Sequence, residues 1–353
     1  MIDYLVIGLG LAGISFCEQL EENNKRFLVI NDGSQTSSLV AGGLYNPVIL
    51  KRFTMAWNAD VQLDTAMHFY NRLESKMGVK LDAKIRIYRK FASIEEQNLW
   101  FEAADKPRLS KFLSTRIIEN ENESIDAPYG LGEVLHTGKI DTKTLVGTYK
   151  FLLEKRGKLL AKSFDFDALI VEKEYVKYKS IKARKIVFAT GFGLKSNPFF
   201  NYLPLQGNKG ELMTIKAPRL KERSIIKSGV FIIPLGEDLY RVGATYERTD
   251  KSNTPTTTAK NELLYKLHTF LKCDYEIADH VAGIRPTVAD RRPLVGLHPK
   301  HRNLIVLNGF GSRGVLIAPT VSKQLYDHLE KGEPLPQEID IKRFAKRYET
   351  KES

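Results

Sequence analysis

Apolar and polar positions along the first thirty or so residues predict a strand, a helix and a second strand. Residues 4–7 form a short apolar run, and residues 11–20 place apolar side chains at helical spacing before a polar stretch at 21–25. Residues 27–30 are apolar again, and glycines separate the first two segments. The pattern predicts one βαβ unit of about thirty residues, the length that a crossover between parallel strands needs.

Further along the chain, helical patterns dominate both ends and strand patterns dominate the middle. The remaining predicted elements are amphipathic helices over 54–124 with one strand at 84–88, a helix at 142–155, a strand at 185–189, strands over 212–246 with a turn at 236–238, a helix at 258–271, a strand at 304–307 and a helix at 315–329. With 353 residues, the chain is long enough for two interleaved domains.

We therefore predict an α/β protein with a discontinuous Rossmann-like nucleotide-binding domain. An interleaved α+β domain built on an antiparallel sheet binds the substrate. The nucleotide-binding domain comprises residues 1–53, 138–205 and 282–353, and the substrate domain comprises residues 54–137 and 206–281.

Composition narrows the class of protein without naming a function. The apolar fraction of 42% and the charged fraction of 27% exclude disordered, collagenous and coiled-coil chains. Two cysteines, Cys17 and Cys273, cannot form a disulfide framework and suit a reducing compartment. The apolar stretch 4–17 lacks a basic flank and is too short to span a bilayer, so we expect a cytoplasmic protein that does not bind membranes.

The chain is basic, with a formal net charge of +12 and a pI near 9.4. Such a surface attracts nucleotide phosphates, acidic substrates or RNA. Most lysines and arginines occur singly, with small clusters at 221–223, 291–292 and 342–347. This distribution favours a solvated basic surface and leaves RNA binding as the alternative.

The glycine turn after the first strand has the spacing of a dinucleotide site. Gly8 permits a tight turn, Gly10 lets the backbone approach a pyrophosphate, and Gly13 lets helix and strand pack closely. The helix beyond offers unpaired N–H groups to phosphates. Asp32 follows Gly13 by nineteen residues, where its carboxylate can accept hydrogen bonds from ribose hydroxyls. The candidate contacts also include Leu11, Ala12 and Asn31. A carboxylate here argues against a 2′-phosphorylated cofactor, and both NAD and FAD fit.

The loop at 37–47 combines hydroxyls, small residues and two glycines, so it can lie flat against a planar ligand with its N–H groups free to donate. It resembles the loop that passes along the isoalloxazine ring in the D-amino-acid oxidase family of flavoproteins. The candidate flavin contacts in it are Ser38, Ala41, Gly42, Gly43 and Leu44.

Four further segments resemble that family in the same order and extend the likeness over almost the whole chain. They lie at 138–141, at 187–191, at 231–234 with 242–245, and at 283–296 with 309–314. The resemblance implies FAD as the cofactor, bound by the nucleotide-binding domain. The further flavin contacts that it implies are Thr190, Gly191, Gly311, Ser312, Arg313, Gly314 and Val315.

Two arginines are candidates for the catalytic centre. The helix after Gly311 would aim its positive end at the ligand, which suits the negative charge of a reduced flavin, and Arg313 could reinforce that charge or reach the substrate. The alternative is a surface arginine. Arg285 lies in an apolar stretch where a charge needs a partner. In the family the equivalent arginine binds the substrate carboxylate at two points; an internal salt bridge is the alternative.

One position departs from the family. D-amino-acid oxidases have a tyrosine directly before Ile-Ile-Pro that helps to hold the carboxylate, whereas this chain has Phe231. Because this hydroxyl is missing, the sequence disfavours a free D-amino acid as the substrate. Tyr246 is our candidate for a replacement hydroxyl, with Tyr45 and Tyr240 as further possibilities.

The resemblance implies oxidation of a C–N bond in a small amine that carries a carboxylate, by hydride transfer to flavin N5 and hydrolysis of the imine. The motifs at 311–314 and 42–47 are also similar to the FAD domain of the bifunctional tRNA wobble-uridine enzyme, which removes a carboxymethyl group from a modified base. A tRNA-directed oxidase is therefore the first alternative. The second is an NAD enzyme or a dinucleotide-binding protein without turnover.

No histidine or cysteine spacing indicates a metal site. The amine, the electron acceptor and the oligomeric state stay open.

Overall fold

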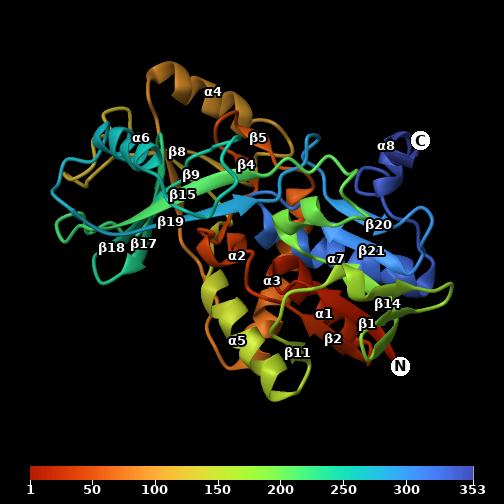
Figure 1. The fold of residues 1–353 in the computed structure, drawn as a ribbon. Helices are drawn as coiled ribbons and strands as arrows, with labels where there is room; N and C mark the ends of the chain where they lie inside the picture. The colour runs from red at the N-terminus through yellow and green to blue at the C-terminus, as the bar shows by residue number, and fades with distance from the viewer. Residues whose placement is uncertain (353) are drawn as a thin grey trace.

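Two eight-stranded sheets organise the computed structural model, which describes residues 1–352 (Figure 1). In the first sheet β11, β2, β1, β14 and β21 run parallel to one another, while the antiparallel pairs β14–β13, β13–β12 and β21–β20 extend it. Its strands are β1 (Ile2–Ile7), β2 (Phe27–Ile30), β11 (Leu159–Leu160), β12 (Leu169–Val171), β13 (Val176–Tyr178), β14 (Ile181–Phe188), β20 (Leu294–Leu297) and β21 (Leu304–Asn308).

The second sheet is mostly antiparallel, with the strand order β19-β15-β18-β17-β16-β7-β9-β8. Its strands are β7 (Ile87–Lys90), β8 (Leu113–Ile118), β9 (Leu131–Val134), β15 (Asn208–Lys216), β16 (Ile225–Lys227), β17 (Phe231–Gly236), β18 (Leu239–Gly243) and β19 (Glu276–Arg285). Two small sheets contain β3 (Leu44–Tyr45), β6 (Asp82–Ala83) and β10 (Gly138–Ile140), and β4 (Val48–Ile49) with β5 (Thr54–Met55).

Helices cover both sheets. They are α1 (Leu11–Glu22), α2 (Ser37–Val40), α3 (Ala59–Met77), α4 (Ile94–Ala104), α5 (Thr142–Lys155), α6 (Thr257–His268), α7 (Gly314–Lys331) and α8 (Ala345–Glu352), with 3-10 turns η1 (Phe166–Ala168), η2 (Gly191–Ser196) and η3 (Ile341–Phe344). In the described part of the chain, none of these helices has the length and apolar character needed to cross a membrane.

The parallel strands of the first sheet carry the nucleotide motif. Val6, Val29 and Val187 are fully buried, because helices and loops cover both faces of this sheet. Since β1, β2 and β14 are parallel, their carboxyl ends meet at one edge, where Gly8 and Thr190 follow. This edge is where nucleotides bind in open α/β sheets.

The second sheet has an outer face and an inner face. On the outer face Met213 and Val242 pack against Leu263 and Leu267 of α6. The inner face carries Ile233 and Gly283, and the loop around α2 lies directly against them. Figure 1 shows α6 and α2 on opposite sides of β15 and β19. The inner face therefore looks toward the nucleotide-binding segments.

The first βαβ unit, the helix at 142–155 and the turn at 236–238 are confirmed. The prediction for 54–124 is wrong in its strands. The expected strand lies at 87–90 rather than 84–88, β8 at 113–118 was expected to be helical, and the two-residue strands β5 and β6 were not expected. The middle of β8 is polar and exposed because β8 is the edge strand, so its sequence lacks a buried stripe. The ten-residue strand β19 was not predicted at all, since its first half is exposed.

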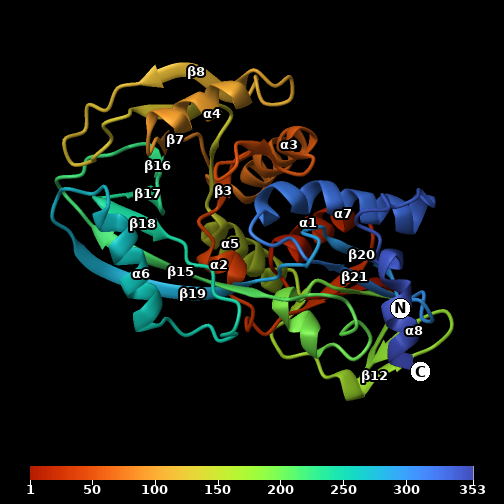
Figure 2. The ribbon, with the colours of Figure 1, turned by 90° about the horizontal axis from the view of Figure 1, so that it is seen from above.

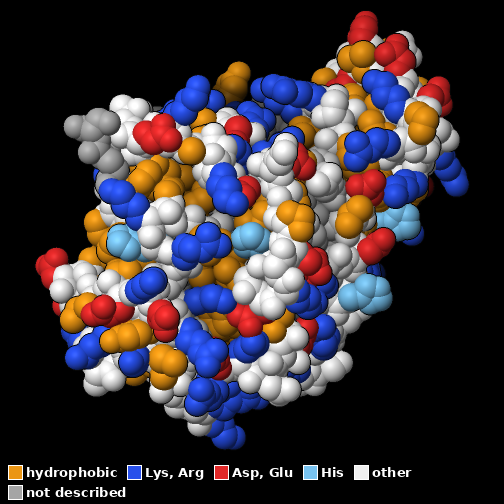
Figure 3. Space-filling view, turned by 90° about the vertical axis from the view of Figure 1, so that its right-hand side faces the viewer, with side chains coloured by type: hydrophobic (Ala, Val, Ile, Leu, Met, Phe, Trp, Pro, Cys, Tyr) orange, Lys and Arg blue, Asp and Glu red, His pale blue; other side chains and the backbone are white. Residues whose placement is uncertain are grey.

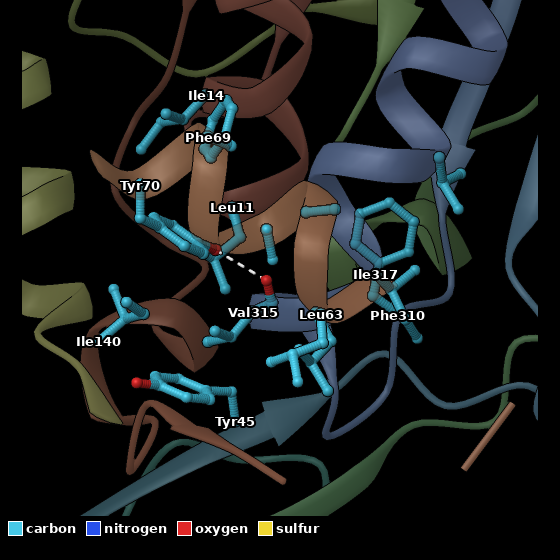
Figure 4. Close-up of a cluster of buried hydrophobic side chains, with 14 of the residues drawn as sticks. Leu11, Ile14, Tyr45, Leu63, Phe69, Tyr70, Ile140, Phe310, Val315 and Ile317 are labelled. Carbon is cyan, nitrogen blue, oxygen red and sulfur yellow. Dashed lines mark hydrogen bonds between the residues drawn. The ribbon is translucent and has the colours of Figure 1, made fainter. Parts of the chain in front are cut away.

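A buried tyrosine replaces a main-chain hydrogen bond that helix α7 lacks. Pro319 lies inside α7 and has no N–H to donate to the carbonyl of Val315, four residues earlier. The hydroxyl of Tyr70 in α3 donates to that carbonyl instead, at 2.9 Å (Figure 4). Around this bond, Leu11 and Ile14 of α1 lie in the same apolar cluster. The contact therefore fixes α3 to the first turn of α7.

We expect Tyr70→Phe to lower the free energy of unfolding by about 1–3 kcal/mol, because it leaves the buried Val315 carbonyl without a donor. Chemical denaturation of the apoprotein measures this loss. In a Pro319→Ala background the new N–H can replace the hydroxyl, so the same change should cost less. Equal losses in the two backgrounds would contradict this account.

Candidate active site

The turn between β1 and α1 accepts only glycine at two of its three glycine positions. At Gly8 the backbone has a φ of 99°, and a Cβ would lie 2.5 Å from the carbonyl oxygen of Ala189. At Gly13 a Cβ would lie 2.1 Å from the carbonyl oxygen of Gly8. The turn, the helix and strand β14 therefore pack closer than any side chain permits.

The N-terminus of α1 is arranged to receive an anion. The N–H groups of Gly10, Ala12 and Gly13 have no acceptor within residues 1–352. Helix α1 begins with no side-chain cap and no acid in its first turn, whereas α4, α5 and α6 each have a capping side chain. Such a free helix end fits a pyrophosphate, which supplies both negative charge and acceptors.

The residues at the end of β2 have separate roles. The side chain of Asn31 accepts a hydrogen bond from Leu9 N–H at 3.1 Å, so it holds the turn. The carboxylate of Asp32 accepts bonds from the N–H of Ser34 and the hydroxyl of Ser163. Partial burial opposes ionisation, but these bonds outweigh it and lower the pKa of Asp32. Asp32 is therefore an ionised acceptor, as a ribose contact requires.

The loop after α2 presents backbone donors beside the second sheet. In the described chain the N–H groups of Ala41, Gly42 and Gly43 have no hydrogen-bond partner. A Cβ on Gly42 would lie 3.1 Å from Ile233 on the inner face, and one on Gly43, where φ is 69°, would lie 2.0 Å from the carbonyl oxygen of Ile140. Ser38 accepts a bond from Leu11 N–H at 3.3 Å, and Leu44 begins β3. The loop is thus held against β10 and the inner face of the second sheet, and Figure 2 shows α2 next to α5 and β19.

A third loop approaches the same edge after β14. The Thr190 hydroxyl is buried and has no hydrogen-bond partner in residues 1–352. Gly191 has a φ of 54°, and its carbonyl accepts a bond from the Asn308 side chain at 3.0 Å. No pattern in the sequence singles out Asn308, which ties the end of β21 to this turn.

Helix α7 is the second helix with a free N-terminus. Gly311 adopts a φ of 56°, and Arg313 is the N-cap residue without a side-chain cap bond. The N–H groups of Ser312, Gly314 and Val315 have no acceptor among the residues described. A Cβ on Gly314 would lie 3.1 Å from Leu11, so the starts of α1 and α7 are neighbours. The free N–H groups of both helices therefore lie in one region of the protein.

These features fit FAD. The free N–H groups of α1 suit its pyrophosphate, Asp32 suits its ribose, and the loop at 41–43 suits a planar ring system. The free N-terminus of α7 supplies positive charge where a reduced flavin needs it. The orphaned hydroxyl of Thr190 is a polar group that a ligand would satisfy.

Arg285 reaches the site from the end of β19. Its Nη1 donates to the Asn208 side chain at 3.0 Å and to the Thr245 carbonyl at 3.2 Å. Its guanidinium covers Gly210, where a Cβ would lie 2.0 Å from Nη2. No Asp or Glu in the described chain lies within 4 Å of it, and burial lowers the pKa of Arg285. The internal salt bridge considered above is therefore absent in residues 1–352.

Arg313 is a second half-buried arginine without an acid partner in the described chain. Its Nη1 donates to the Asn46 carbonyl at 3.1 Å, and burial lowers the pKa of Arg313. Within residues 1–352 it forms no ion pair. Arg313 is thus not a surface arginine. Two partly desolvated guanidinium groups leave donors available for an anion that residues 1–352 do not supply.

Of the three candidate tyrosines, Tyr246 has the best position. The Tyr45 hydroxyl donates to Asp82 at 2.7 Å, and the Tyr240 hydroxyl accepts from Glu222 N–H at 3.1 Å. The ring of Tyr246 lies 4.6 Å from the guanidinium carbon of Arg285. Its side chain is 70% exposed, which leaves its hydroxyl accessible to a ligand. Its proximity to Arg313 also opposes the lowering of that group's pKa.

Sequence reasoning missed the groups that orient the arginines. Asn208 and Thr245 come from β15 and the segment after β18, and only the pairing of β15 with β19 brings Asn208 to Arg285. Asn46 lies within the loop at 37–47, yet it binds Arg313 through its main chain, which its residue type does not reveal. In the described chain no group of histidine, cysteine and acidic side chains could hold a metal.

The surface charge does not form one patch on the face that Figure 3 shows. Lysine and arginine side chains are scattered there among acidic and apolar groups. Many basic side chains also have acidic partners; Lys76, Arg156 and Lys158, for example, surround Glu21. This arrangement agrees with the solvated basic surface favoured above.

Comparisons with known proteins cover most of the chain. The family model described as FAD dependent oxidoreductase (DAO) matches residues 3–328. A glycine oxidase from Bacillus subtilis (strain 168) is 25% identical over 352 residues, which cover 92% of this chain and 91% of that protein. The bifunctional protein MnmC of tRNA 5-methylaminomethyl-2-thiouridine biosynthesis from Azoarcus sp. (strain BH72) is 28% identical over 176 residues, 44% of this chain and 28% of that protein. The crystal structure of glycine oxidase from Geobacillus kaustophilus aligns with a TM-score of 0.80 at 18% identity and covers 97% of both chains.

Proposed function

This chain belongs to the DAO family of FAD-dependent oxidoreductases, and we propose that it oxidises the C–N bond of a small amino acid or N-substituted glycine. It is an enzyme with FAD as its cofactor, and it acts on amino-acid or amine substrates. The finer proposal names the kind of amine: one with a carboxylate on the carbon that is oxidised.

Arg285 is the observation that carries this proposal. Its side chain is half-buried, oriented by Asn208 and Thr245, and free of any acid in residues 1–352. A planar fork of donors matches a carboxylate at two points. Tyr246 covers one side of the guanidinium and leaves a hydroxyl for the same ligand.

The reaction needs no acid–base pair from the protein. The substrate amine is a free base, and the carbon beside it loses a hydride with its electron pair, which leaves an iminium ion. FAD accepts that hydride when bound. Water then adds to the iminium carbon, and the C–N bond breaks to give an oxo acid and the amine. Arg285 binds the substrate carboxylate and so places the carbon that is oxidised, which raises kcat/KM.

The first turn of α7 and Arg313 supply positive charge to the same region. Free N–H groups at Gly314 and Val315 and the guanidinium of Arg313 are fixed before any ligand binds. Preorganised donors stabilise negative charge that develops during a reaction without rearrangement of the protein. We assign this stabilising role to the two N–H groups and to Arg313.

Anaerobic bleaching of the flavin absorbance tests the function directly. Purified holoenzyme is mixed with glycine, sarcosine, proline and a panel of D-amino acids, and loss of the oxidised flavin bands reports hydride transfer. We expect bleaching by glycine or an N-substituted glycine. Bleaching by none of these amines would refute the proposal.

A tRNA-directed oxidase is the second candidate, favoured by the similarity to MnmC over 44% of the chain and by the net charge of +12. In this version the amine is a carboxymethylaminomethyl-uridine, which is chemically an N-substituted glycine. Tight binding of tRNA that weakens steeply with salt, together with bleaching by modified tRNA alone, would favour it over a small amine.

A further inference from the structure

A row of side chains crosses the inner face of the second sheet from Arg285 to Lys227. Partners in adjacent antiparallel strands share a face, and so do residues two apart in one strand. From the guanidinium of Arg285 the row passes through Gly210 and Leu212 of β15, Gly243 of β18, Phe231 of β17 and Lys227 of β16. Lys227 and Arg285 therefore lie on the same face of the sheet, the face against which the loop at 37–47 packs.

The ammonium of Lys227 lies beside the residue that departs from the family pattern. Its Nζ is 4.6 Å from the ring centroid of Phe231 and donates one hydrogen bond, at 3.3 Å, to the Gly229 carbonyl. The lysine thus places charged donors next to a ring that has no hydroxyl of its own.

No anion in the part of the chain that the structure describes neutralises Lys227. Within residues 1–352 no Asp or Glu oxygen lies within 4 Å of Lys227 Nζ. The charged groups that act on it are Arg89 and Lys266, both cations, and each already has its own acid, Glu96 and Glu262 respectively. Burial above all, and then these cations, lower the pKa of Lys227 to about 8. A half-buried cation in this setting is stabilised by an anion that comes from outside.

We propose that Lys227 determines specificity by binding a second carboxylate of the amine substrate, at the far end from the carboxylate that Arg285 holds. The substrate class is then an amine with two acid groups, such as an N-carboxymethyl amino acid. Phe231, between the two cations in the row, packs against the methylene chain that joins the acids. This inference rests on the proposed function and narrows its substrate.

A series of matched amines tests the proposal on the holoenzyme. The diacids are the N-carboxymethyl derivatives of glycine, β-alanine and 4-aminobutyrate, and the mono-acid control is N-propylglycine. We expect the wild type to prefer one diacid in kcat/KM. Lys227→Met should lower kcat/KM for that diacid about 10- to 100-fold and for N-propylglycine less than about threefold, because one charged hydrogen bond is lost. Lys227→Arg should retain most of the preference.

The matched control is Lys266→Met. Lys266 lies in α6 and pairs with Glu262. This variant should leave the preference unchanged. Equal losses for diacid and mono-acid in Lys227→Met, or a wild type that prefers the mono-acid, would overturn the proposal.

If no amine bleaches the flavin, ligand binding still tests the role of Lys227 separately from the proposed reaction. Glutarate and acetate are then titrated into the oxidised holoenzyme, and the change in flavin absorbance reports affinity. A preference for glutarate that Lys227→Met abolishes supports the role of Lys227 even if the proposed reaction fails. Equal affinity for glutarate in wild type and variant would refute it.

Discussion

Replacing Arg285 with methionine is expected to lower kcat/KM for the amine substrate by about three orders of magnitude and to leave FAD bound. The change removes one partner of a buried ion pair, which costs about 3–5 kcal/mol, and each 1.36 kcal/mol is a factor of ten. The loss should appear mainly in KM, because the carboxylate is bound in the ground state as well as in the transition state. Steady-state kinetics and the flavin spectrum measure the two effects separately.

Two further variants make this prediction specific. Arg291→Met removes an exposed arginine six residues away and should change neither parameter. Gly210→Ala places a methyl group 2.0 Å from Arg285 Nη2, so it should displace the guanidinium and raise KM without removing the charge. If substrate affinity survived in both Arg285→Met and Gly210→Ala, the carboxylate would be bound elsewhere.

The nucleotide half of the site could be predicted because its signal is local. Gly8, Gly13 and Asp32 lie within one βαβ unit. The positive φ of Gly8 and the contact of Gly13 with the Gly8 carbonyl are properties of the turn itself, although Ala189 of the next segment also crowds Gly8. The spacing of these residues therefore encodes the turn without knowledge of the remaining fold.

The substrate half depends on contacts between distant segments. Arg285 could be singled out as a charge in an apolar stretch, but its partners Asn208 and Thr245 are 77 and 40 residues away. They meet it only because β15 pairs with β19, and β19 itself gave no clear pattern in the sequence. Lys227 was missed for the same reason, since its neighbour Phe231 belongs to the next strand of the sheet.

Gly13→Ala should yield a protein that no longer retains FAD. A methyl group there would lie 2.1 Å from the Gly8 carbonyl oxygen, and because that oxygen is main chain, α1 or the turn must move. Either movement withdraws the N–H groups of Gly10, Ala12 and Gly13 from the pyrophosphate. Loss of two such charge-assisted bonds weakens FAD binding at least about 100-fold, and the overpacking costs a further 1–3 kcal/mol or so of stability.

Gly147→Ala is the matched control, because Gly147 lies within α5 and a Cβ there meets no atom within 4 Å. It should keep its FAD and gain about 0.5–1 kcal/mol of stability from the helix propensity of alanine. The flavin absorbance per polypeptide and thermal unfolding with and without added FAD distinguish the variants: added FAD should raise the midpoint for Gly147→Ala but not for Gly13→Ala. Stoichiometric FAD in purified Gly13→Ala would mean that the pyrophosphate does not depend on this turn, and the cofactor site would have to be sought at the N-terminus of α7 instead.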